Sequence, residues 1–161
     1  MLIEVHVPTQ MLTLRDADGQ VLMRTRVATA RKGVGEEYGS ERTPRGWHVV
    51  RAKIGQGLAA GAVLVSRRPT GEIYTPALRR QFPERDWILT RILWLSGLEP
   101  GKNRLGKVDT MRRKIYIHGC PDEDAMGIPS SHGCVKMRNS EVIELFDRVP
   151  AGTRVHIIAQ D

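Results

Sequence analysis

Aromatic residues and cysteines are scarce in this chain, and each shortage argues against a class of protein. Phe, Trp and Tyr make up only 5% of the 161 residues, too few to suggest a platform on which nucleic-acid bases stack. The basic residues are scattered over several segments, so nucleic acid is not an expected partner. In a reducing compartment Cys120 and Cys134 are not expected to form a structural disulfide, and nearby histidines suggest metal binding or catalysis instead.

Long hydrophobic stretches are missing too. No segment approaches the roughly 18 apolar residues of a membrane span, so we expect no span. The chain begins Met1-Leu2-Ile3-Glu4, which is typical of a first strand and not of a secretory signal. We therefore expect a cytoplasmic protein, or a periplasmic one if the sequence is a trimmed form of a longer chain.

The composition that is present fits a single globular domain over residues 1–161. Hydrophobic residues make up 40% of the chain, enough for a core, and charged residues 27%. The net charge is +7, which favours anionic partners or is simply a solvated basic face.

Alternation of apolar and polar residues predicts a mostly β domain. Residues 3–7 and 12–14 alternate, and Asp18-Gly19 is a strong hairpin turn before a strand over residues 20–29. These segments predict an antiparallel meander. Further strands are expected at 47–54, 62–66, 87–95, 114–117 and 155–157, and one helical turn at 76–80.

One longer helix is expected after Cys134. Asn139 or Ser140 is a suitable N-cap, and Pro150 with Gly152 ends the helix. Its apolar residues recur at helical spacing: Val142, Leu145, Phe146 and Val149.

The segment Ser131-His132-Gly133-Cys134 holds the parts of a nucleophilic site. A thiol becomes a nucleophile when an imidazole takes its proton, and the resulting oxyanion needs N–H donors. His118 and His132 are both candidate bases, and spacing does not choose between them. Gly133 lets the backbone approach a ligand closely, so nearby amides could form the oxyanion hole.

Two other interpretations remain open on spacing alone. Cys134 could be a small buried apolar residue, as a lone cysteine usually is. The pairs His118-Gly119-Cys120 and His132-Gly133-Cys134 could also supply four zinc ligands, although one intervening residue is fewer than zinc pairs usually have.

Several motifs together resemble the L,D-transpeptidase catalytic domain of the YkuD type. The likeness covers nearly the whole chain, and the His…Ser-His-Gly-Cys signature is its most specific part. The segments that carry it are Thr9-Gln10, Thr43-Pro44-Arg45-Gly46, Ile117-His118-Gly119, Gly127-Ile128-Pro129 and Ser131 to Asn139. The resemblance implies a β-sandwich of mixed sheets with one or two short helices, and action on peptidoglycan stem peptides.

The resemblance also implies roles for single residues. Cys134 would be the nucleophile and His118 the general base, oriented by the carbonyl of Gly119. His132, Gly133 and Ser131 would support the site or its oxyanion side, and no cofactor or metal is implied. Substrate-binding roles would fall to Arg138, Asn139 and Lys136.

Two positions depart from the family pattern. Lys136 stands where arginine is usual, which puts any bidentate carboxylate contact borrowed from the family in doubt. Cys120 stands where threonine is usual; its expected role is packing. A sharper hypothesis is an oxidative lock, in which Cys120 and Cys134 form a disulfide that silences the site.

The implied reaction has two halves. Cys134 attacks the bond between the third stem residue, often meso-diaminopimelate, and the D-alanine at the fourth position, and forms a thioester. Water then gives an L,D-carboxypeptidase of peptidoglycan recycling, which the expected cytoplasmic location favours. An amine instead gives an L,D-transpeptidase that makes 3–3 cross-links or exchanges D-amino acids, and a carbapenem could form an adduct. A wall-binding module with a dead site is a further alternative.

Overall fold

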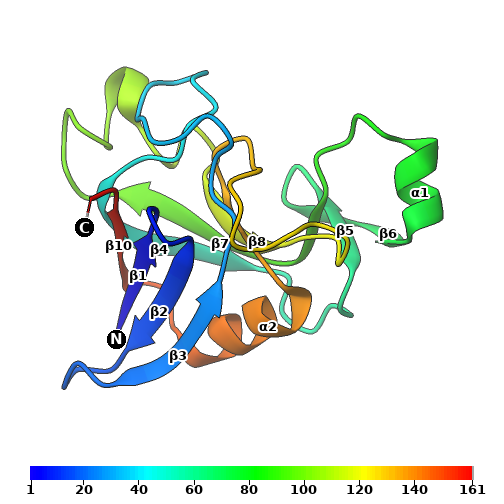
Figure 1. Cartoon of the computed structure of the whole chain (residues 1–161), viewed down its shortest axis with the longest axis horizontal. Coiled ribbons are helices and arrows are strands. Elements are labelled where there is room, and N and C mark those ends of the chain that lie inside the picture. Colours follow the sequence, from blue (N-terminus) through cyan, green and yellow to red (C-terminus); the bar gives the residue numbers. More distant parts are fainter. Residues whose placement is uncertain (161) are drawn as a thin grey trace.

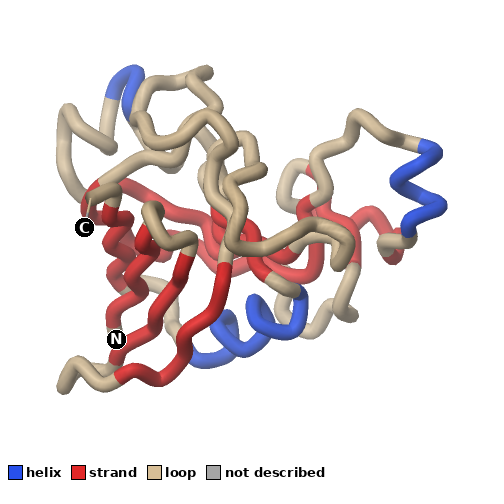
Figure 2. Tube along the Cα trace, in the orientation of Figure 1, coloured by secondary structure: helices blue, strands red, loops and turns tan. Residues whose placement is uncertain are grey.

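The computed structural model describes residues 1–160, and Figures 1 and 2 show its strands, helices and long loops. The first strands form the predicted meander, with Asp18-Gly19 in the turn between the second and third. The elements are β1 (Leu2–His6), β2 (Met11–Arg15), β3 (Val21–Arg26), β4 (Gly46–Ile54), β5 (Ala62–Val65), β6 (Arg68–Ile73), α1 (Pro76–Gln81), β7 (Ile88–Gly97), a 3-10 turn (Gly106–Val108), β8 (Tyr116–Gly119), β9 (Val135–Met137), α2 (Asn139–Arg148) and β10 (Arg154–Ile158).

The strands hydrogen-bond into one curled, mixed sheet. Its main path runs β3-β2-β1-β10-β4-β7-β5-β6, and β8 pairs with β7 and with β9. The β1–β10 and β8–β9 pairs are parallel, and the other pairs are antiparallel. The strand predicted over 87–95 is central, because β7 bonds to β4, β5 and β8. The predicted mainly β fold with a helix after Cys134 is confirmed.

The main core lies between the curled sheet and α2, which runs along the lower side of the view in Figure 1. The helix buries the face predicted from its spacing, since Val142, Leu145 and Phe146 are fully or almost fully shielded from solvent. These side chains pack with apolar residues of β8 and β9, including Ile117 and Val135. Helix packing therefore fixes the two short strands that carry the candidate site.

A lobe made of β5, β6 and α1 extends to the right of the main body in Figure 1. α1 begins at Pro76, and the Thr75 side chain caps it by accepting a hydrogen bond from the amide of Leu78 at 3.1 Å. A small core of Val63, Trp87 and Leu89 connects this lobe to β7.

Four details of the sequence-based prediction were wrong. The strand expected over 114–117 is β8, which spans Tyr116–Gly119 and so includes His118. β3 ends at Arg26 and not at 29, because the chain then leaves β2 and Ala28 pairs with Lys136. Val21 is exposed, because the β2–β3 register shifts beside Arg15. β6 was not expected. Neither Asn139 nor Ser140 is the N-cap of α2: Arg138 holds that position, and Asn139 is the first helical residue.

Candidate active site

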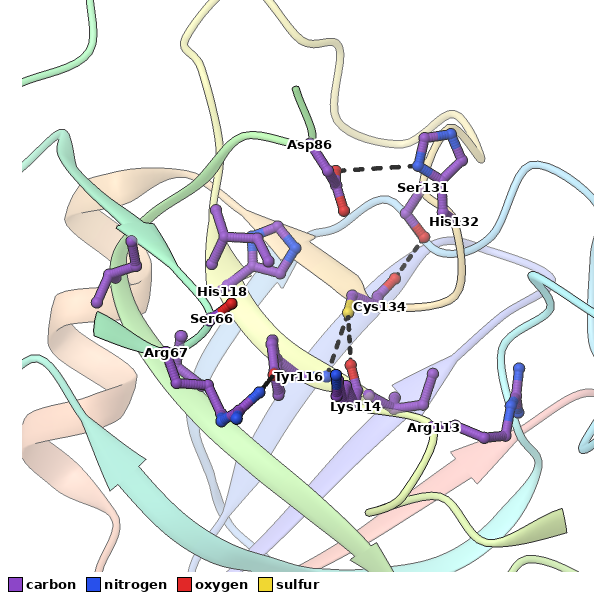
Figure 3. Close-up of a pocket in the computed structure, with 14 residues that line it drawn as sticks. Ser66, Arg67, Asp86, Arg113, Lys114, Tyr116, His118, Ser131, His132 and Cys134 are labelled. Atoms are coloured by element: carbon purple, nitrogen blue, oxygen red, sulfur yellow. Dashed lines mark hydrogen bonds and ion pairs between the residues drawn. The ribbon is translucent and has the colours of Figure 1, made fainter. Parts of the chain in front are cut away.

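Parallel pairing of β8 and β9 brings His118 and Cys134 to one cavity. Ile117 of β8 pairs with Val135 of β9, so Cys134, which precedes β9, lies level with Tyr116. Side chains alternate along strands, and therefore Cys134, Tyr116 and His118 share one face. That face lines a cavity of about 290 Å³. Figure 3 shows the thiol and the imidazole extending into it from neighbouring segments.

The sulfur of Cys134 contacts backbone groups of β8 and of the segment just before it. The Tyr116 amide donates a hydrogen bond to Cys134 Sγ at 3.3 Å, and the thiol donates to the Lys114 carbonyl at 3.5 Å. Burial raises the pKa of the Cys134 thiol to about 12, although the Tyr116 amide and the Arg113 guanidinium act in the opposite direction. The resting sulfur is therefore a thiol, and it needs a base to become a nucleophile.

His118 is buried and held in one tautomer. Its exposed fraction is 2%, and its Nδ1 lies 2.6 Å from the Gly119 carbonyl oxygen. Because a carbonyl only accepts, Nδ1 carries the hydrogen and Nε2 has a free lone pair. Burial lowers the pKa of His118, and Asp86 and the Gly119 contact offset part of that effect. The ring is thus neutral at pH 7 and able to accept a proton.

The segment before Cys134 is fixed by the Ser131 and Thr43 hydroxyls. Ser131 Oγ donates to the Cys134 carbonyl at 2.5 Å and accepts from the Gly133 amide at 3.2 Å. Thr43 Oγ1 donates to the Gly133 carbonyl at 2.9 Å. Gly133 has φ of +130°, and a Cβ there would crowd Ile115 and the Arg42 carbonyl, so glycine is required.

The second candidate base, His132, lies at the rim of the same cavity. Its side chain is 66% exposed, and its Nδ1 lies 3.9 Å from a carboxylate oxygen of Asp86 (Figure 3). No backbone carbonyl orients this ring among the described residues. The geometry therefore favours His118 over His132 as the base, a choice that sequence spacing had left open.

The three residues expected to bind substrate do not line the cavity of Cys134. Lys136 pairs with Asp124 at 2.7 Å, and Arg138 donates to the Asp122 carbonyl at 2.8 Å. The side chain of Asn139 faces the end of β8, where its Nδ2 donates to the Cys120 carbonyl at 3.0 Å. All three instead hold the loop over residues 120–130.

Cys120 is fully buried and far from Cys134. Its thiol donates to the Met137 carbonyl at 3.3 Å, and burial raises its pKa to about 11. Along the β8–β9 ladder Cys120 lies about four residues beyond Cys134, roughly 13 Å at the usual strand rise. A disulfide needs Cα atoms within about 7 Å, so the oxidative lock is wrong for this fold.

The structure also gives no support to the zinc site. Within residues 1–160, no three His, Cys, Asp or Glu side chains are grouped so that they could hold a metal ion. Nor does that part of the chain contain a helix long and apolar enough to cross a membrane.

Sequence reasoning missed several residues of the cavity wall. Tyr116, Arg67, Asp86 and Arg113 all line it, and Arg67 donates to the Tyr116 hydroxyl at 3.1 Å while stacking on Trp94. Tyr116 could have been found, because it lies two residues before His118 on a predicted strand. The others come from loops whose path no local pattern predicts.

Comparison with known proteins places the chain in a family. The model of the L,D-transpeptidase catalytic domain (YkuD) matches residues 1–157, and the chain belongs to this family, which is a family of cysteine-type enzymes. An Escherichia coli relative named as a probable L,D-transpeptidase, ErfK/SrfK, is 29% identical over 131 residues, covering 80% of this chain and 36% of the relative. The chain thus spans about a third of that protein.

Solved structures show the same fold. An L,D-transpeptidase from Mycobacterium smegmatis superposes with a TM-score of 0.58 at 19% identity, covering 98% of this chain and 58% of the other. A structure of the L,D-transpeptidase LdtMt1 in complex with imipenem gives a TM-score of 0.57 at 16% identity, with 98% and 58% coverage. The resemblance inferred from the sequence motifs is therefore confirmed.

Proposed function

We propose that this protein cleaves peptidoglycan tetrapeptide stems at the L,D bond between the third residue and the D-alanine at the fourth position, through a thioester on Cys134. The observation that carries the proposal is the pairing, in one cavity, of the Cys134 thiol with a buried His118 whose tautomer is set by the Gly119 carbonyl. Membership of the L,D-transpeptidase family supports the choice of substrate.

The proposed first half-reaction begins with two neutral groups. His118 Nε2 takes the thiol proton as the sulfur attacks the carbonyl carbon of the third stem residue. The amide of Cys134 is our candidate donor to the developing oxyanion, because the Gly133 amide is already bonded to Ser131. When the C–N bond breaks, the imidazolium returns the proton to the amine of the leaving D-alanine, and the acyl group stays on sulfur.

We propose water as the favoured acceptor in the second half-reaction. The cavity wall carries Arg67, Arg113 and Lys114 and only one acidic residue, Asp86. A positive wall repels an amine, which arrives as an ammonium ion, and does not repel water. The neutral His118 would take a proton from water as it attacks the thioester, and the tripeptide would be released.

Amine transfer remains the second candidate, and Asp86 is the observation that favours it. This carboxylate lies at the rim beside His132, where it could attract an ammonium group. The product would be a 3–3 cross-link or a stem with an exchanged D-amino acid. The location of the protein also bears on the choice between water and an amine, because a cytoplasmic location favours water. That location stays a prediction, which cell fractionation can test.

One incubation separates these reactions. The protein is mixed with disaccharide tetrapeptide, and products are identified by mass spectrometry, with Cys134→Ala as the inactive control. Free D-alanine with disaccharide tripeptide supports the carboxypeptidase, and cross-linked dimers support the transpeptidase. If Cys134→Ala releases as much D-alanine as the wild type, the proposed chemistry is wrong.

Inhibition supplies an independent probe of the thiol. We propose that a carbapenem acylates Cys134, by analogy with the relative solved in complex with imipenem. The expected result is a mass increase equal to one imipenem on the wild type and no increase on Cys134→Ala.

A further inference from the structure

Thr90 adopts a backbone conformation that a β-branched residue rarely takes. Its φ is +76°, although it lies within β7 and is fully buried. The pairing of β7 with β8 is irregular over this stretch, between Leu89 and Ile92. Such strain persists only where surrounding contacts hold it, and it is concentrated at functional sites.

The unusual backbone directs the Thr90 hydroxyl into a short chain of hydrogen bonds. Oγ1 accepts from the Gly61 amide at 2.9 Å and donates to Asn139 Oδ1 at 2.6 Å. Asn139 Nδ2 in turn donates to the Cys120 carbonyl at 3.0 Å. The Thr90 hydroxyl donates its proton to Asn139, and the Cys120 carbonyl can only accept. The Asn139 amide is therefore held with its oxygen toward Thr90 and its nitrogen toward Cys120.

These two side chains enclose the backbone of Gly119. A Cβ added at Gly119 would collide with Asn139 Oδ1 and the Leu89 carbonyl, and would crowd the Thr90 Cβ. The carbonyl of Gly119 is the group that accepts from His118 Nδ1, and the next carbonyl, that of Cys120, is bonded to Asn139. The peptide that orients the imidazole is thus packed closely at Gly119, and the peptide after it is tied to Asn139.

We propose that Thr90 and Asn139 are positioning residues for His118. They act through the backbone at Gly119 and Cys120: Asn139, held by Thr90, binds the Cys120 carbonyl, and both side chains pack against Gly119. The Gly119 carbonyl is thereby kept where it holds the imidazole in the Nδ1–H tautomer with Nε2 toward Cys134. The inference rests on the proposed function of Cys134 and His118. It also gives Asn139 a role other than substrate binding, and explains why its side chain does not cap α2.

The test measures how fast a small electrophile alkylates Cys134, which needs no peptidoglycan substrate. Iodoacetamide reacts with the thiolate, so its rate reports proton removal by His118. Mass spectrometry of the peptides separates Cys134 from the buried Cys120. D-alanine release is measured in parallel, so failure of the proposed function would be seen as a wild type that is alkylated but releases no D-alanine.

Thr90→Val keeps the shape and removes the hydroxyl. We expect it to slow both alkylation and kcat by a factor on the order of 10² with little change in KM, because a small misplacement of a catalytic group costs about that much. Thr90→Ser keeps the hydroxyl and is expected to restore most of the rate. Thr13→Val, at a buried threonine of β2, is the matched control for the loss of a threonine hydroxyl and is expected to leave both rates unchanged.

Asn139→Asp provides a second, independent variant. It is nearly isosteric, removes the donor to Cys120, and places an acidic residue in the first turn of α2, where acids favour the helix. The alkylation rate and kcat of Asn139→Asp should fall by the same factor as those of Thr90→Val. The double variant should be no slower than either single variant, because both substitutions break one hydrogen-bond network. The inference is overturned if Asn139→Asp alkylates at the wild-type rate, or if Thr90→Ser is as slow as Thr90→Val.

Discussion

Asp86 is the acidic side chain in the cavity wall, and its charge acts on both Cys134 and His118. Burial lowers the pKa of His118 while Asp86 raises it, and burial raises the pKa of Cys134 while Asp86 raises it further. Asp86→Asn should therefore lower both pKa values. Because neutral His118 is the proposed base, the acid limb of the rate should move to lower pH in Asp86→Asn.

The measurement is the alkylation rate of Cys134 between pH 4 and 8, with Glu84→Gln, a nearby carboxyl outside the cavity lining, as the matched control. The usual pKa of histidine is about 6.5. Because the folded pKa of His118 is lowered, the acid limb of the wild-type rate is expected below that value. A limb that moves to higher pH in Asp86→Asn would contradict the assignment of His118 as the base.

Cys120 should be chemically silent. Its thiol is buried and hydrogen-bonded, with its pKa raised to about 11 by burial, and Cys134 is out of reach. Cys120→Ser should therefore keep the wild-type sensitivity of activity to peroxide, and oxidised wild type should show no intramolecular disulfide by mass spectrometry. A disulfide between Cys120 and Cys134 in that experiment would mean that the β8–β9 ladder opens readily.

At the residue scale, spacing in the sequence singled out Cys134 as the candidate nucleophile but not its base, and only the family resemblance pointed to His118. His118 and His132 were equivalent on spacing, because spacing does not show which ring is buried and which carbonyl orients it. The Gly119 contact follows from the residue next to His118, but the roles of Thr90 and Asn139 depend on contacts 49 residues apart in the chain.

Asp124 ties the loop over residues 120–130 to two other elements. It accepts from Arg79 of α1 at 2.8 Å and pairs with Lys136 of β9 at 2.7 Å. Burial alone would raise the pKa of Asp124, but Lys136 and Arg79 outweigh it and lower the pKa. Asp124→Asn should reduce the free energy of unfolding at pH 7 by about 2 kcal/mol, as for other hydrogen bonds to partly buried charges.

The pH dependence checks that assignment. Because the folded pKa of Asp124 is lowered, its stabilisation is present above the unfolded value of about 3.9 and is lost as pH falls through the folded value. Urea unfolding should therefore show a difference between wild type and Asp124→Asn at pH 7 that shrinks near pH 3. Asp122→Asn, whose carboxylate lies in the same loop, is the control, and an equal loss there would contradict the role of Asp124.

Element prediction succeeded where one face of a strand or helix is buried. β1, β2, β4 and the apolar face of α2 follow their patterns closely. β6 was missed because nearly all of its side chains are exposed and it contains Pro69 and Gly71, so no alternation is visible. The N-cap was wrong because Asn139 uses its side chain in a tertiary network, which overrides a local preference.

At the scale of the whole molecule, the site depends on contacts between distant parts of the chain. Segments near residues 28–30, 43 and 131–136 meet through the Ala28–Lys136 and Ala30–Ser131 bridges and through Thr43, which accepts from the Ala30 amide and donates to Gly133. The Cys134 segment is therefore held by the amino-terminal third of the chain, and no motif around Cys134 contains that information.

The stability of the whole fold should depend on the ionisation of His48. This ring is fully buried in β4, with Nδ1 3.0 Å from the Gly46 carbonyl and Nε2 3.0 Å from Thr110 Oγ1. Burial lowers its pKa to about 4. The unfolded chain binds a proton near pH 6.5, so between these two values it holds more protons than the folded chain, and stability rises with pH.

The stabilisation from neutral His48 is thus complete above about pH 6.5 and is lost as pH falls toward 4, a change of up to about 3 kcal/mol. His48→Gln should flatten the curve of unfolding free energy against pH, measured with urea from pH 4 to 7. Some slope should remain, because burial lowers the pKa of His118 as well. His132→Gln, at an exposed position, is the control. An unchanged slope in His48→Gln would mean that His48 takes up its proton while still in the folded protein, and that the loop carrying Thr110 opens before the sheet does.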